Sequence, residues 1–254
     1  FHLRRGVQFH NGREMTSKDV KATFQRLMHP ESRSHAKWIF ADVEGAEAFM
    51  AGSCREVAGI ETPDPLRLRI RLRRPLSYFS SLLAMGETSI IPAEPAENFA
   101  AFGAEPVGAG PFPLHRVEKE QAIILRKFKN YYDYQAPHVD EVQFQIYPLS
   151  PAAKVDEFLQ GKADILTDLP LSRFEQLKNE AVFSVPMHSL KTLFVGLNQS
   201  YEPLKDARVR KALNLAVDRD RINREFFNGF YKPAQGIIPP GMFGYNPAAA
   251  GYGH

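Results

Sequence analysis

Residues 66–73 alternate between apolar and basic side chains. The apolar positions are Leu66, Leu68, Ile70 and Leu72, and the basic positions are Arg67, Arg69, Arg71 and Arg73. Because successive side chains of a strand point to opposite faces, this period of two predicts a strand with one buried face and one row of arginines in water. Aromatic side chains that would stack on bases are not interleaved with the arginines. We therefore predict a solvated face balanced by nearby Asp and Glu, rather than a nucleic-acid surface.

Capped amphipathic stretches predict helices on both sides of this strand. Thr16 and Asp19 have the spacing of a capping box, and the apolar spacing behind them predicts a helix over residues 17–28. Ser150 followed by Pro151 predicts the start of another helix. Asp206 predicts a third, and Asp218 a fourth. Their expected inward-facing residues are Val209, Leu213, Val217, Ile222 and Phe226.

The remaining patterned stretches mix short strands with short helices. Strands are predicted over residues 1–9, 122–128, 139–147, 163–166, 182–185 and 192–197. Short helices are predicted over residues 43–50, 76–85 and 171–177. Because helices and strands are interspersed without a strict alternation, the predicted fold class is mixed α/β (α+β).

Composition and motifs argue against an enzymatic activity. A net charge of +3 does not require a basic nucleic-acid face. The eight histidines are scattered, so we expect no metal site, and the single Cys54 cannot form an internal disulfide. No G-x-S-x-G elbow occurs, and Gly108-Ala109-Gly110-Pro111 lacks the residues of a phosphate loop, so a sharp turn is expected there. The sequence therefore predicts neither an enzyme nor a cofactor.

Trp38 is the only tryptophan of the chain, and it follows a polar loop instead of standing in a periodic stripe. A tryptophan packed in the core is the default interpretation. A tryptophan that lines a ligand cleft is the alternative, and the sequence leaves both open.

Taken in order along the chain, several motifs resemble one known family. They are Phe1-His2-Leu3-Arg4-Arg5 with His10-Asn11-Gly12, then Val107-Gly108-Ala109-Gly110-Pro111-Phe112, then Asn130-Tyr131-Tyr132, then Pro203-Leu204-Lys205-Asp206-Ala207-Arg208-Val209-Arg210, and Ile238-Pro239-Pro240-Gly241. They are similar to motifs of the family 5 extracellular solute-binding proteins, the dipeptide- and oligopeptide-binding components of ABC importers. Ala109 replaces the usual Thr of that family, which leaves the subfamily open.

The resemblance implies a periplasmic-binding-protein-like fold of type II, cluster C. It implies an extra small domain over residues 1–105, the main part of the first ligand-binding lobe over 106–240, and the start of the connection to the second lobe over 241–254. The family's full chain is about twice as long, so we expect a fragment whose second lobe is largely missing.

The resemblance also implies a function. The chain would capture peptides or similar small solutes by closure of two lobes and deliver them to the membrane permease of an ABC importer, as an exported, periplasmic or cell-surface monomer without cofactor or nucleic acid. A solute-sensing regulatory domain, or a binder of a metal chelate or sugar, remains the alternative.

Two places are expected to face the solute on the family pattern. The first is the loop after the first helix, with Ser34, Trp38 and Phe40. The second is the end of the strand that contains Gly196, Leu197 and Asn198, where backbone groups and an amide that both donates and accepts suit a peptide bond.

Overall fold

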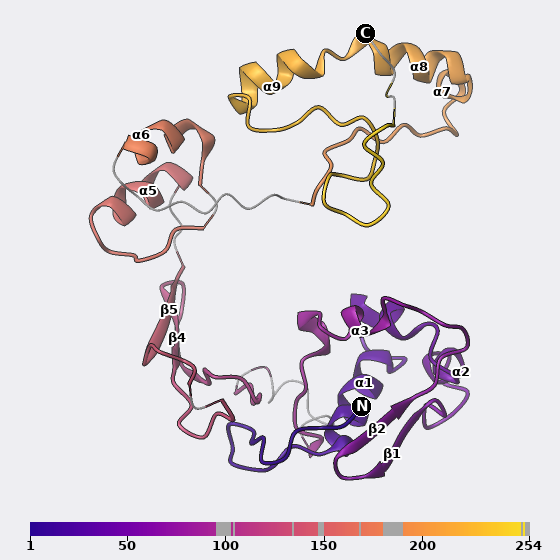
Figure 1. The fold of residues 1–254 in the computed structure, drawn as a ribbon, viewed down its shortest axis with the longest axis vertical. Coiled ribbons are helices and arrows are strands. Elements are labelled where there is room, and N and C mark those ends of the chain that lie inside the picture. The colour runs from indigo at the N-terminus through magenta and orange to yellow at the C-terminus, as the bar shows by residue number, and fades with distance from the viewer. Residues whose placement is uncertain are drawn as a thin grey trace. The chain divides into compact units, whose positions relative to one another are not determined.

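The computed structural model describes residues 1–94, 103, 105–133, 135–146, 150–167, 169–179, 190–249 and 251. Figure 1 shows the ribbon, which divides into two compact units, residues 1–148 (unit 1) and residues 149–254 (unit 2). Helices and small antiparallel sheets are mixed, so the predicted mixed α/β class is confirmed. No helix of the described residues is long and apolar enough to cross a membrane.

The described residues of unit 1 form helices and two small sheets. Its helices are α1 (Ser17–Met28), η1 (His35–Phe40), α2 (Ala46–Met50), α3 (Phe79–Leu82) and η2 (Gly86–Thr88), of which η1 and η2 are 3₁₀ turns. Its strands are β1 (Ile60–Asp64), β2 (Arg67–Ile70), β3 (Leu114–Glu118), β4 (Ala122–Arg126) and β5 (Glu141–Gln145).

Helix α1 organises the core of unit 1. It spans the predicted residues 17–28, and Thr16 and Asp19 form the predicted capping box. Its apolar side packs on the β1–β2 hairpin, on η1 and on α2. The buried residues of this core include Phe24, Met28, Phe40 and Ile60. One amphipathic helix therefore fixes where the following loop, residues 29–40, can lie.

Helix α1 is also tied to residues 91–93 by buried polar contacts. The Thr23 hydroxyl accepts a hydrogen bond from the backbone N–H of Ile91 (3.1 Å) and lies 3.2 Å from the carbonyl oxygen of the same residue. Asp19 accepts a hydrogen bond from the backbone N–H of Ala93 at 2.9 Å. These contacts hold the segment that follows η2 against the helix, since buried backbone groups need such partners.

The arginine row lies on the exposed face of the β1–β2 hairpin, as predicted. Arg71 pairs with both Glu44 and Glu61, and Glu61 also pairs with Arg69. The other pairs are Arg67 with Asp64, Arg73 with Glu47, and Arg74 with Asp42. The acidic side chains of the same unit therefore balance this basic face.

The predicted continuous strand over residues 1–9 is wrong. Phe1 and Leu3 exchange backbone hydrogen bonds with Leu66 and Leu68 next to β2, but the chain then turns at Gly6, whose φ is +72°. Val7 and Phe9 instead pair with the segment 13–15. The left-handed conformation at Gly6 breaks the strand into two short extended pieces.

The second sheet of unit 1 is antiparallel, with the order β3-β4-β5. Ile123 of β4 pairs with Val117 of β3 and Phe144 of β5. The strands predicted over residues 122–128 and 139–147 are confirmed as β4 and β5, each shorter than expected. The helices predicted over 43–50 and 76–85 are likewise shorter in the structure, because α2 begins only after Gly45, at φ +78°, and α3 is a single turn.

The described residues of unit 2 form short helices and no strand. They are α5 (Pro151–Leu159), η4 (Leu171–Arg173), α6 (Phe174–Asn179), α7 (Glu202–Lys205), α8 (Ala207–Ala216) and α9 (Arg219–Phe227). Ser150 caps α5, Asp206 caps α8 and Asp218 caps α9, as predicted. The helix predicted over 171–177 corresponds to η4 and α6.

Four predictions for unit 2 need correction or fall outside the described residues. Residues 163–166 and 192–197 form no strand, and the predicted strand 182–185 lies outside the residues that the structure describes. The apolar residues of α8 and α9 that were expected to face inward are exposed, Phe226 by 70%. Within the described residues of unit 2, no core packs against these apolar faces. Amphipathic spacing alone therefore does not predict that they are buried.

Candidate functional site

The loop Ser34–Phe40 places one large aromatic side chain in solvent. Ser34 caps η1, since its hydroxyl accepts a hydrogen bond from the backbone N–H of Ala36 at 3.1 Å. Trp38 is 56% exposed, whereas Ile39 and Phe40 next to it are buried. The default interpretation of Trp38 as a core residue is therefore wrong. The buried side chains of Ile39 and Phe40 hold the 3₁₀ turn to the core, and the indole ring of Trp38 is exposed on this turn.

Phe40 is placed differently from the prediction. Its side chain is 0% exposed and packs on Phe24 of α1 with ring centroids 4.9 Å apart. A side chain buried in the core offers no surface to a solute. Phe40 therefore supports the turn that carries Trp38, and the prediction that it forms part of a ligand wall is corrected.

The second predicted place, residues 196–198, lies in unit 2 and is irregular. Gly196 and Asn198 are exposed and Leu197 is half-buried. The side-chain oxygen of Asn198 accepts a hydrogen bond from the backbone N–H of Ser200 at 2.9 Å, and its carbonyl oxygen accepts one from Tyr201 at 3.1 Å. Asn198 thus closes the turn that leads into α7 while its own side chain stays accessible.

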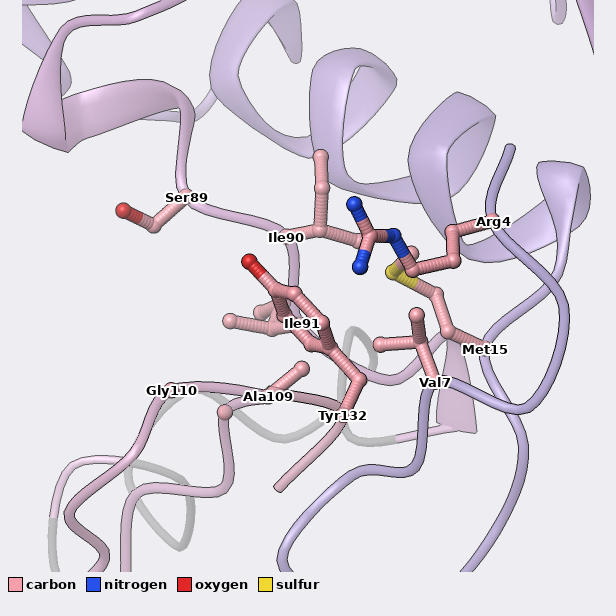
Figure 2. A pocket seen from close by; sticks show the side chains of 10 residues that line it. Arg4, Val7, Met15, Ser89, Ile90, Ile91, Ala109, Gly110 and Tyr132 are labelled. Atoms are coloured by element: carbon pink, nitrogen blue, oxygen red, sulfur yellow. The ribbon is translucent and has the colours of Figure 1, made fainter. Parts of the chain in front are cut away.

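A pocket in unit 1 is a feature that the sequence did not predict (Figure 2). It has a volume of about 460 Å³. It is assembled from the segment before α1, the segment after η2, the glycine turn and Tyr132. The residues that line it are Arg4, Val7, Met15, Ser89, Ile90, Ile91, Gly108, Ala109, Gly110 and Tyr132.

The lining of this pocket brings a cation, Arg4, onto an aromatic ring, that of Tyr132. The Arg4 guanidinium lies over the Tyr132 ring, 4.7 Å from its centroid. Figure 2 shows both side chains reaching into the same space. The Tyr131 ring lies 4.5 Å from that of Tyr132. A hydrogen bond with Tyr132, with burial as a second cause, raises the pKa of Tyr131 to about 12, so this phenol stays neutral at physiological pH.

His10 holds the glycine turn that forms one wall of the pocket. The backbone N–H of Gly108 donates to Nδ1 of His10 at 3.1 Å, and Nε2 lies 3.0 Å from the carbonyl oxygen of Gly110. Because a backbone N–H only donates, Nδ1 must accept and Nε2 must carry the proton. The ring also packs edge-on against Phe128. The imidazole of His10 thus contacts both Gly108 and Gly110 of the turn that is predicted at residues 108–111.

Among the described ranges, no group of three or more His, Cys, Asp or Glu side chains could hold a metal ion. The thiol of Cys54 is exposed and lies 3.2 Å from the carbonyl oxygen of Glu56, away from the pocket residues. Exposed aromatic side chains and cation–π pairs are both features that proteins use in recognition.

Comparisons with known proteins give a consistent result. The model of the bacterial extracellular solute-binding proteins, family 5 middle region, matches residues 1–253. The glutathione-binding protein GsiB of Salmonella choleraesuis is 27% identical over 98% of this chain and 48% of its own length. This chain therefore spans about half the length of the curated relatives that it matches.

Solved structures show the same likeness. The OppA structure of Burkholderia pseudomallei is 26% identical, with a TM-score of 0.81 over 95% of this chain and 48% of the other. The binding protein AgaA of A. tumefaciens R10, solved with agropinic acid, is 30% identical, with a TM-score of 0.78 over 99% of this chain and 48% of the other. The resemblance and the fold that the sequence motifs implied are confirmed: the chain belongs to family 5 of the bacterial extracellular solute-binding proteins.

Proposed function

We propose that this chain is part of the substrate-binding component of an ABC importer. The observation that carries the proposal is the family match over residues 1–253. The protein would capture a solute between two lobes and present the closed form to a membrane permease. No bond of the solute would be made or broken. The place of action would be outside the cytoplasmic membrane, in the periplasm or at the cell surface, with a monomer as the working unit.

The names of the relatives support a peptide or another amino-acid derivative as the solute. GsiB is described as glutathione-binding, and one OppA structure contains the peptide RPPGFSPFR. AgaA was solved with agropinic acid. Peptide-sized solutes are the most common class among these names, so we propose a short peptide as the first solute to test.

We propose that Trp38 is the solute contact of unit 1, supported by the cap at Ser34, and that Gly196, Leu197 and Asn198 contribute contacts from unit 2. The exposure of the indole on a turn whose neighbours are buried supports the first part. The exposure of Gly196 and Asn198 supports the second. Large rigid aromatic side chains contribute contact area at a small cost in conformational entropy.

Solute release and uptake test this proposal. We expect the full-length protein, purified without denaturation and then unfolded, to release a small solute that mass spectrometry identifies. Deletion of the gene should abolish uptake of that solute in isotope-labelled form, and a plasmid copy should restore uptake. Normal uptake in the deletion strain, together with altered transcription on addition of the solute, would instead favour a sensing role.

A further inference from the structure

We propose that the pocket around Arg4 and Tyr132 is a binding site for a small carboxylate with an apolar body. Trp38 is not among the residues that line this pocket, so the site is separate from the solute contact proposed above. The proposal therefore stands on the geometry of unit 1 alone and does not depend on which solute an importer would carry.

Arg4 can be compared with Arg13, which also lies over an aromatic ring, that of Phe9, and with the arginines of the β1–β2 hairpin. Arg13 pairs with Asp19 and Glu94, and the arginines of the hairpin pair with Asp or Glu side chains. The contact that Arg4 makes is with the face of the Tyr132 ring. Within the described part of the chain, no carboxylate lies at ion-pair distance from its guanidinium. Arg4 is therefore able to pair with the anionic group of a ligand.

The stacking on Tyr132 prepares Arg4 for a planar anion. A guanidinium that lies over an aromatic ring keeps its N–H groups at its edge, where they donate in a fork that matches the two oxygens of a carboxylate. Because the Tyr132 ring already restrains Arg4 before a ligand arrives, binding costs less side-chain conformational entropy. The hydroxyls of Ser89 and Tyr132 are further polar groups of the lining.

The rest of the lining is apolar and fits a hydrophobic ligand body. Val7 and Ile91 are buried side chains of the lining, and Met15 and Ile90 stand beside them (Figure 2). The volume of about 460 Å³ is in the range of small-molecule sites. A pocket with one cation and apolar walls selects a ligand with one anionic end and an apolar or aromatic end.

Gly110 provides a way to fill this pocket without straining the backbone. A Cβ atom added at Gly110 would meet no atom within 4 Å, and the φ of this glycine is not in the left-handed region. A larger side chain here would extend into open space by the pocket, where it would compete with a ligand. Gly110→Val therefore tests the cavity itself, whereas Arg4→Gln tests the charge.

Calorimetric titration of the full-length protein with two matched probes tests the proposal. The probes are N-acetyl-L-phenylalanine and its uncharged amide, N-acetyl-L-phenylalaninamide. We expect the acid to bind about tenfold more tightly than the amide, since a charge-assisted hydrogen bond is worth that much. Arg4→Gln should remove this preference. Gly110→Val should weaken both probes.

Arg5→Gln is the control, because Arg5 is an exposed neighbour that does not line the pocket, and it should bind both probes as the unmodified protein does. Thermal unfolding of Arg4→Gln should match that of Arg5→Gln, which separates loss of the site from loss of folding. Equal affinity for acid and amide, no binding of either probe, or an unchanged preference in Arg4→Gln would each overturn the proposal. None of these outcomes bears on solute uptake, which is measured separately.

Discussion

Replacing Asp19 by alanine is expected to lower the free energy of unfolding of unit 1 by about 3 kcal/mol. The carboxylate is only 1% exposed. It accepts hydrogen bonds from the guanidinium of Arg13, from the backbone N–H and hydroxyl of Thr16, and from the N–H of Ala93. Its loss leaves the N–H groups of Thr16 and Ala93 without this acceptor in a buried place, and urea denaturation of the full-length protein measures the difference.

The same carboxylate predicts a dependence of stability on pH. Burial alone would raise the pKa of Asp19, but the hydrogen bonds from Arg13, Thr16 and Ala93 outweigh burial, and the pKa lies below its ordinary value. A carboxyl with a lowered folded pKa stabilises the fold above its unfolded pKa of about 3.9 and loses this contribution as pH falls through the folded value. The gap in stability between the native protein and Asp19→Ala should therefore be full at pH 7 and should shrink below about pH 4.

Glu94→Gln is the matched control for Asp19. Glu94 is the other carboxylate that pairs with Arg13, at 2.9 Å, but its side chain is 65% exposed. An exposed ion pair is worth about 0.5 kcal/mol. A loss at Glu94→Gln as large as that at Asp19→Ala would show that the charge of Arg13, and not the buried network, is what matters.

Replacing Phe40 by alanine is expected to cost about 3 to 5 kcal/mol, because a fully buried ring leaves a cavity that the core closes only in part. Trp38→Ala, two positions earlier, removes a larger but exposed side chain and should change stability by about 0.5 kcal/mol. Urea denaturation of both variants checks the pair. Equal losses would mean that Trp38 belongs to the core and would remove the basis for its proposed role.

The helix starts could be predicted because their causes are local. Thr16, Ser150, Asp206 and Asp218 each begin the helix expected from them. A cap acts on backbone groups two or three residues away, so the sequence contains the whole interaction.

Strands and buried faces were predicted less well because their causes are distant. A strand exists only where another segment supplies hydrogen-bond partners, and residues 163–166 and 192–197 have none in the described unit. The stretch 1–9 failed for a different reason, the left-handed turn at Gly6. The spacing of α8 and α9 marks an apolar face but does not say what covers it.

The candidate sites show the same limit. Trp38 is the lone tryptophan and follows a polar loop, and its exposure excludes the core interpretation, whereas its contact with a solute stays a prediction. Phe40 was misplaced because neighbouring residues of a 3₁₀ turn point in different directions, which the loop sequence does not reveal. The Arg4–Tyr132 pair joins segments far apart in the chain, so no local spacing could have indicated it.

Calorimetric titration of the full-length protein tests the proposal of solute capture most directly. The probes are reduced glutathione and agropinic acid, taken from the names of the relatives. We predict that at least one binds with one solute per protein, is recovered unmodified by mass spectrometry, and binds about tenfold more weakly to Trp38→Ala, since a single aromatic anchor is worth that much. Failure of both probes to bind, or their conversion to products, would contradict the account.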